Sequence, residues 1–157
     1  MDFGGRNGMG LQEELTKQVN AMRRATFESS DQLSLGAIIK KVLPIAERKE
    51  GEDPTVRFDF GNLFPTYIDS WRGSYNELAL NYTEDYSKEK PKTITEFLMM
   101  LKEAIGKTYT GYKGGEYVMD ENTPVWVANY GQSGDTAVID IIDEDYEVII
   151  ITGRRKF

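Results

Sequence analysis

The C-terminal part of the chain constrains the fold most, because three strand-like runs follow one another with only short turns between them. The runs span residues 124–130, 136–142 and 146–152, and the turns contain residues 131–134 and 143–145. Parallel neighbours need a long crossover, so connections this short predict an antiparallel three-stranded meander. The last run is almost continuously apolar, which is typical of a strand buried on both faces.

Two upstream runs alternate apolar and polar residues, whereas the segment between them does not. Residues 55–60 and residues 75–82 each alternate, which predicts strands with one buried face. Residues 61–74 lack this alternation and predict a long irregular segment. In the run at residues 124–130, Trp126 lies on one face and Val125 and Val127 on the other. We expect both faces to be covered, and the alternative is that one face forms the floor of a pocket.

Three further segments carry apolar residues at helical spacing. Ser34 is the predicted N-cap of a helix that Pro44 ends or kinks at Leu43, since proline does not fit a helix interior. Thr93 and Glu96 form a capping-box pattern before a helix that stops near Gly106. The remaining helix spans about residues 11–27, with a single apolar stripe made of Leu11, Leu15, Val19 and Met22.

Together these elements predict an α+β fold with an antiparallel sheet of about five strands and two or three helices packed on one face. Residues 1–10 contain four glycines and predict a flexible lead-in. Residues 11–157 then form a single domain, because 157 residues suffice for one core and are few for two. Residues 11–28 are a helical arm that packs either on this domain or on a second copy of the chain.

The chain contains no histidine and no cysteine, which removes whole classes of chemistry. Without histidine it lacks the usual general base and the Ser-His and Cys-His nucleophile pairs. Without cysteine it has no disulfide and no thiolate metal site, as is usual in a reducing cytoplasm. We therefore expect a protein that is not an enzyme and that holds neither a metal nor a cofactor.

The formal net charge of −7 disfavours direct binding to nucleic acid, which needs a basic surface. The longest apolar run, residues 148–151, is too short to cross a bilayer, and the chain shows no secretory signal pattern. We thus expect a cytoplasmic protein that does not bind membranes. The acidic residues around 140–147 are interpreted as a solvated turn, with docking on a basic protein as the alternative.

Two glycine-bearing segments combine aromatic rings with a cation, and they supply the candidate ligand-binding residues. Aromatic faces stack on flat ligands, Arg and Lys bind phosphate or carboxylate, and glycine allows close approach of the backbone. The structural alternatives are that the first segment plugs the edge of the core and that the second is a bent hairpin needing glycine for its geometry. The candidate residues are Trp71, Arg72, Tyr75, Tyr109, Tyr112, Lys113 and Gly114.

Several segments between residues 34 and 131 have a specific wording, namely 34–36, 58–61 (Phe-Asp-Phe-Gly), 70–75 (Ser-Trp-Arg-Gly-Ser-Tyr), 78–80, 104–115 and 123–131. In these segments the chain resembles a group of small, uncharacterised bacteriophage-encoded proteins. The resemblance implies a phage accessory protein that acts in the cytoplasm of an infected bacterium, and it implies no reaction. In the group Tyr often stands where this chain has Trp71, and residues 1–30 lie outside the resemblance.

The hypothesis that joins these features is a non-enzymatic counter-defence protein that sequesters a small anionic, nucleotide-like ligand between the two glycine-aromatic loops. In this hypothesis the rings stack on the ligand while Arg72 and Lys113 neutralise its charge. Because such pockets often form between subunits, we also expect a homo-oligomer. One alternative is an acidic inhibitor of a host defence or nucleic-acid enzyme, as a nucleic-acid mimic. A second is an enzyme that uses carboxylates and tyrosine.

Overall fold

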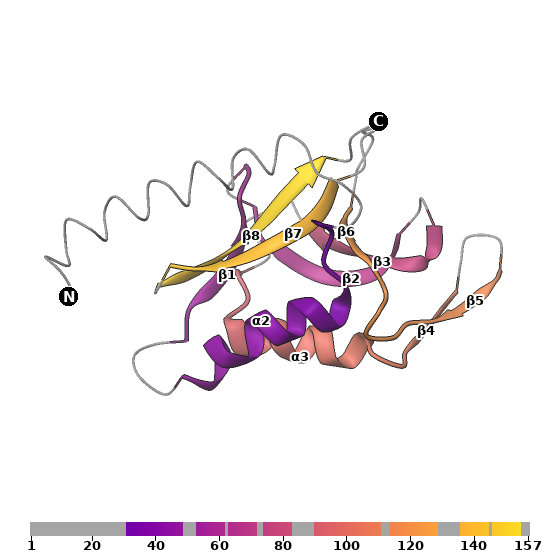
Figure 1. Cartoon of the computed structure of the whole chain (residues 1–157), viewed down its shortest axis with the longest axis horizontal. Helices are drawn as coiled ribbons and strands as arrows, with labels where there is room; N and C mark the ends of the chain where they lie inside the picture. Colours follow the sequence, from indigo (N-terminus) through magenta and orange to yellow (C-terminus); the bar gives the residue numbers. More distant parts are fainter. Residues whose placement is uncertain are drawn as a thin grey trace, which may run out of the picture.

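The computed structural model describes residues 31–48, 53–61, 63–71, 74–82, 90–110, 114–128, 136–144 and 146–154. A curved sheet lies above two helices, and a small two-stranded hairpin projects from one end (Figure 1). The expected lead-in and helical arm, residues 1–28, lie outside the described ranges. The described elements are α2 (Leu35–Glu47), β1 (Thr55–Phe58), β2 (Pro65–Trp71), β3 (Ser74–Tyr82), α3 (Ile94–Ala104), β4 (Thr108–Thr110), β5 (Glu116–Val118), β6 (Val125–Val127), β7 (Thr136–Asp143) and β8 (Glu147–Arg154).

The main sheet has six strands in the order β1-β8-β7-β6-β3-β2, and a separate sheet pairs β4 with β5. The predicted C-terminal meander is confirmed, since β6, β7 and β8 pair antiparallel in sequence order. The prediction of a wholly antiparallel sheet is wrong, because β1 pairs with β8 and β3 pairs with β6 in parallel. Both parallel pairs join strands that are distant in sequence, so turn lengths could not reveal them.

The prediction of a long irregular segment at residues 61–74 is also wrong, because it contains β2. Burial along β2 is irregular and the β2–β3 register shifts twice, between Pro65 and Tyr67 and between Ser70 and Trp71. Such bulges interrupt the two-residue repeat by which a strand is identified in a sequence. The strand exists because β3 supplies its ladder of hydrogen bonds.

Both described helices pack on one face of the sheet, as predicted. Together with this face they form a buried hydrophobic cluster, here called the inner cluster. The sheet is strongly curved, since β1 and β2 contact each other although they lie at opposite ends of the strand order. Phe58 of β1 and Tyr82 of β3 meet edge to face with ring centroids 5.9 Å apart. The inner cluster includes Leu35, Ile38 and Val42 of α2, Phe97 and Leu101 of α3, and Val56, Leu80, Val125, Val148 and Ile150 of the sheet.

Helix α2 begins at the predicted cap, where the Ser34 hydroxyl accepts a hydrogen bond from the Ala37 amide at 3.2 Å. The alternative in which it ends at Leu43 is wrong, because the helix continues through Pro44 to Glu47. Pro44 is exposed, whereas Ile45 and Ala46 beyond it pack against the inner cluster. Burial of this last turn therefore offsets the hydrogen bond that proline cannot donate.

Gly36 lets the first turn of α2 pack directly on the turn before β6. Its amide donates to the Glu121 carbonyl at 2.8 Å. A Cβ atom at residue 36 would lie 2.8 Å from the Glu121 Cβ and 2.9 Å from its carbonyl oxygen. Only glycine allows this approach, which fixes α2 to the segment leading into the sheet.

Helix α3 has the predicted capping box, with the Thr93 hydroxyl and the Glu96 carboxylate each accepting from the other residue's amide. It ends before Gly106, whose φ of 77° is the left-handed conformation expected of a glycine stop. Gly106 then donates to the Met119 carbonyl at 2.7 Å. The end of α3 thus anchors the β4–β5 hairpin.

Candidate functional site

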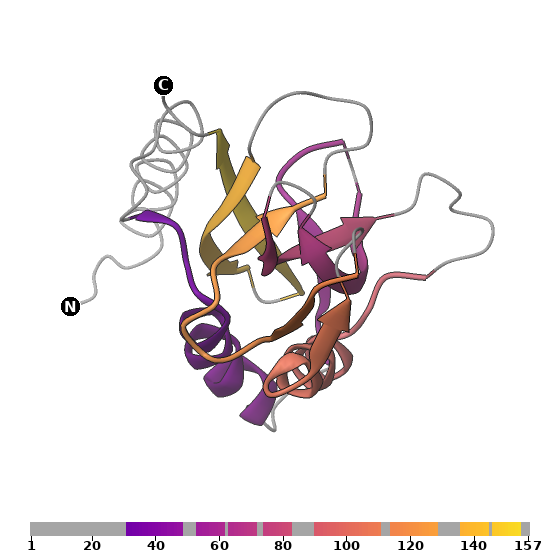
Figure 2. The same cartoon turned by 90° about the vertical axis from the view of Figure 1, so that its right-hand side faces the viewer.

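The two glycine-aromatic segments flank neighbouring hairpins at one end of the molecule, here called the hairpin end. One segment contains the β2–β3 turn and the other the β4–β5 turn. Strand β4 contacts both β2 and β3, and β5 contacts β3. Figure 2 views the molecule from this end, with β4 and β5 in front of the helices and sheet. The structure therefore brings together the strands that lead into both candidate segments.

Trp71 lies at the end of β2, where its indole packs against Trp126 of β6. The two rings are stacked, with centroids 4.1 Å apart and planes 11° from parallel. The Trp126 Nε1–H donates to the Glu77 carboxylate at 2.7 Å. One face of the Trp71 ring is therefore occupied within the protein, as in the structural alternative that the sequence offered. Both faces of β6 are buried, as predicted.

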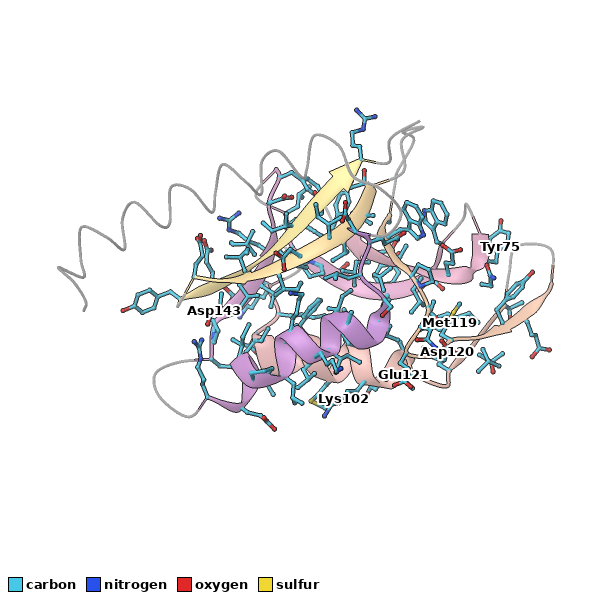
Figure 3. All side chains as sticks on the ribbon, in the orientation of Figure 1. Tyr75, Lys102, Met119, Asp120, Glu121 and Asp143 are labelled. Atoms are coloured by element: carbon cyan, nitrogen blue, oxygen red, sulfur yellow. The ribbon has the colours of Figure 1, made fainter. Side chains whose placement is uncertain are left out.

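Tyr75 lies near the start of β3 and is half-buried. Figure 3 shows its side chain at the tip of the sheet, facing the region where β4 and β5 project. The Tyr75 side chain makes no ring contact and no hydrogen bond with another described residue. Among the candidate rings that the structure describes, Tyr75 is thus the one whose position and partial exposure suit contact with a ligand.

Tyr109 lies in the middle of β4 and is only 6% exposed. Its hydroxyl is buried and has no hydrogen-bond partner among the described residues. Burial raises the pKa of Tyr109, and the negative charge of Asp69 raises this pKa further. The Lys107 ammonium lies 5.1 Å from the centroid of the Tyr109 ring, within cation–π range. Burial removes the hydration of this hydroxyl, and no hydrogen bond to a described residue compensates for that loss.

The rings of the two segments belong to different clusters of the core. Tyr109 is part of the inner cluster, on the face covered by the helices. Trp71 packs instead on the outer cluster, on the opposite face. A ligand touching both rings would therefore have to reach around the end of the β2–β3 hairpin. The outer cluster consists of Ala79, Trp126, Ala137, Ile139, Ile149 and Ile151.

Gly114 is the one candidate glycine in the described part of the chain, and it is exposed with φ of 90°. This backbone conformation supports the interpretation of the second segment as a hairpin that needs glycine. Arg72, Tyr112 and Lys113 lie outside the described residues. Their role therefore stays a prediction from the sequence.

Sequence reasoning missed the groups that surround these rings. Trp126 was expected to be buried in a strand, with a pocket floor as the alternative, and Glu77 and Lys107 were not singled out. The Asp69 Oδ1 accepts from the Ser70 amide at 2.8 Å, and the negative charge of Asp69 raises the pKa of Tyr109. The Trp126–Glu77 and Asp69–Tyr109 interactions join residues distant in sequence, so no local pattern indicates them.

Three acidic residues of the β7–β8 hairpin, Asp140, Asp143 and Glu147, are paired with cations from α2, its C-cap and β1. Lys41 contacts Asp140 at 3.2 Å, and Arg48 binds Asp143 through both terminal nitrogens. Arg57 binds both oxygens of Glu147 at 3.0 Å, and this hydrogen bonding raises the pKa of Arg57. The pairing agrees with a structural turn. The described residues contain no cluster of acidic side chains that could hold a metal ion.

Comparison of the chain with protein-family models, with curated proteins and with solved structures finds no match in any of the three. Within the described ranges, no helix has the length and apolar character needed to span a membrane.

Proposed function

We propose that this protein is a non-enzymatic binding protein that sequesters a small anionic, nucleotide-like ligand at the hairpin end. The observation that carries the proposal is the Tyr109 hydroxyl, which is buried without a described partner where β4 contacts β2 and β3. Buried polar groups are nearly always hydrogen-bonded, so an exception at a junction of two hairpins is a candidate ligand contact. The resemblance to phage proteins supports a counter-defence role in an infected bacterium.

The charged residues near the hairpin end favour different chemical groups of the ligand in two regions, one with carboxylates and one with cations. Asp69 and Glu77 are carboxylates, so a phosphate would not be placed beside them. A ribose hydroxyl or a base amino group, which donates hydrogen bonds, suits this region better. The phosphate is assigned to Arg72 and Lys113 on the two bends, and the flat base to the partly exposed ring of Tyr75.

Thermal unfolding in the presence of a panel of mono-, di- and cyclic nucleotides tests the proposal. A ligand at a hundred times its Kd stabilises the native state by about 2.7 kcal/mol, which raises Tm by roughly 5 to 10 °C in a chain of this size. At least one nucleotide should produce such a shift. If no nucleotide raises Tm and a host protein co-purifies in stoichiometric amount, the acidic inhibitor replaces the binding protein as the proposed function. Turnover of a nucleotide would instead support the alternative of an enzyme that uses carboxylates and tyrosine.

Two variants locate the site, each with a matched control. Arg72→Ala and Tyr109→Phe should remove most of the nucleotide-induced shift while the free proteins still unfold cooperatively. Lys102→Ala, on the last turn of α3, and Tyr67→Phe, exposed on β2, should keep the shift. Equal loss in variants and controls would place the ligand elsewhere. Light scattering of the free and the liganded protein checks the predicted homo-oligomer.

A further inference from the structure

The face of the sheet turned away from α2 and α3 is apolar and buried. Trp126 and Ile151 are each 4% exposed and Ile149 is 6% exposed. They alternate along β6 and β8 with the residues of the inner cluster, so they point away from it. A sheet with isoleucine buried on both faces requires a layer of chain on each side.

The described elements outside the six-stranded sheet do not supply that second layer. Helices α2 and α3 contribute their buried residues to the inner cluster, and the β4–β5 hairpin does so through Tyr109, Tyr117 and Met119. The described residues that pack against the outer cluster are Trp71, Ala128 and Ile142, which belong to the strands of the same sheet or follow one. The cover must therefore come from another part of the chain or from another molecule.

The path of the chain into α2 points to the N-terminal segment. The Leu33 amide donates to the Val138 carbonyl at 2.9 Å, and the Val125 amide donates to the Leu33 carbonyl at 3.3 Å. The Gln32 side chain donates to the Val125 carbonyl at 2.9 Å. The chain thus reaches its first described residues alongside β6 and β7, two of the strands that carry the outer cluster.

The sequence of the N-terminal segment matches such a role in length and polarity. A helix over residues 11–27 would be about 25 Å long, close to the length of the eight-residue strands β7 and β8. Its apolar stripe holds Leu11, Leu15, Val19 and Met22, and the opposite side holds Glu13, Lys17, Asn20 and Arg24. The other segments outside the described ranges, such as residues 83–89 and 131–135, are polar.

We propose that residues 11–27 form an amphipathic helix that packs its apolar stripe on the outer cluster of the same chain. The sheet then has helices on both faces, and the N-terminal segment is part of the fold. The proposal does not depend on the ligand proposed above.

Paired cysteine variants test the contact directly, since the natural chain has no cysteine to interfere. Cysteine at Leu15 or Val19 is combined with cysteine at Ile139 or Ile151, and the control pairs use Lys17 or Asn20 instead. The stripe pairs should form a disulfide within one chain under mild oxidation, seen by non-reducing electrophoresis and by mass spectrometry of the linked peptides. Disulfides formed equally in the controls, or only between two chains, would overturn the proposal.

Two neighbouring substitutions provide a second measurement without cross-linking. Val19→Asp and Asn20→Asp each add one negative charge, but only Val19 belongs to the stripe. The two tryptophans of the chain, Trp71 and Trp126, lie at the outer cluster, so their fluorescence reports on its cover. Val19→Asp should lower Tm by roughly 5 °C or more and shift the emission to longer wavelength, whereas Asn20→Asp should change neither. Equal behaviour of the two variants would overturn the proposal.

Discussion

At the scale of single residues, the protein places its most unusual polar group in the core. The Tyr109 hydroxyl has no hydrogen-bond partner among the described residues, whereas the Trp126 Nε1–H, on the other face of the sheet, donates to Glu77. Trp71 and Trp126 use their aromatic faces on each other. The aromatic residues therefore differ in their polar contacts. The Trp126 Nε1–H has an acceptor in the Glu77 carboxylate, whereas the Tyr109 hydroxyl has no partner among the described residues.

Tyr109→Phe should raise the free energy of unfolding at neutral pH by about 1 kcal/mol, because it removes a buried hydroxyl that lacks a partner. The difference from the natural protein should grow above about pH 10. Because the folded-state pKa of Tyr109 is raised, the unfolded chain ionises first and the natural protein loses stability as pH rises. Urea unfolding checks this, with Tyr67→Phe as the exposed control. A loss of stability in Tyr109→Phe would show that the hydroxyl has a partner.

At the scale of elements, the helices hold the hairpin end in place. Helix α3 leads through Gly106 into the β4–β5 hairpin, where the Met119 amide donates to the Lys107 carbonyl at 3.0 Å. Its N-terminus is joined to the start of β1, because the Ile94 amide donates to the Pro54 carbonyl at 2.7 Å. The helix therefore links the sheet to the hairpin that carries Tyr109, and its stability bears on the candidate site.

Thr93→Ala should lower the free energy of unfolding by about 1 kcal/mol, since it removes the hydroxyl that caps the Glu96 amide. Thr95→Ala, in the first turn of the same helix and exposed, is the matched control and should leave stability unchanged or slightly raised. Chemical denaturation of both variants measures the effect. Equal changes in the two would mean that the capping box contributes little.

At the scale of the whole molecule, the two ends of the described chain are joined in one sheet. Strand β8 lies between β1 and β7, and Val56 is in register with Val148. Beyond the paired residues, the Thr152 hydroxyl and amide both donate to the Asp59 carboxylate, at 2.7 and 3.0 Å. Within the described sheet, β8 is the only strand that pairs with β1 through hydrogen bonds. The fold thus depends on its last strand.

A chain ending at Glu144 should therefore fail to unfold cooperatively, because β1 loses its partner and the residues facing Val148 and Ile150 are exposed. A chain lacking only residues 155–157 is the control and should keep a sharp thermal transition. Near-ultraviolet circular dichroism and thermal unfolding distinguish the two. Cooperative unfolding of the shorter chain would show that β8 is dispensable.

The sequence by itself determined the features that depend on neighbouring residues. The capping box at Thr93, the N-cap at Ser34, the stop at Gly106 and the buried strand at residues 147–152 were all predicted, and the structure confirms them. Each involves residues within a few positions of one another or one short apolar run. Local hydrogen bonding and side-chain periodicity therefore suffice to predict them.

Only the tertiary structure decided what depends on pairing between distant residues. It placed β1 beside β8, made a strand of residues 65–71, carried α2 through Pro44, and put Trp71 and Tyr109 on opposite faces of the sheet. Of the candidate site, the sequence indicated the two glycine-aromatic segments, but not the pairing of β2 with β3 or the Trp126, Glu77 and Asp69 contacts. The physical reason is that burial and long-range pairing supply free energy that outweighs local preference, and no local pattern records which distant strand will supply it.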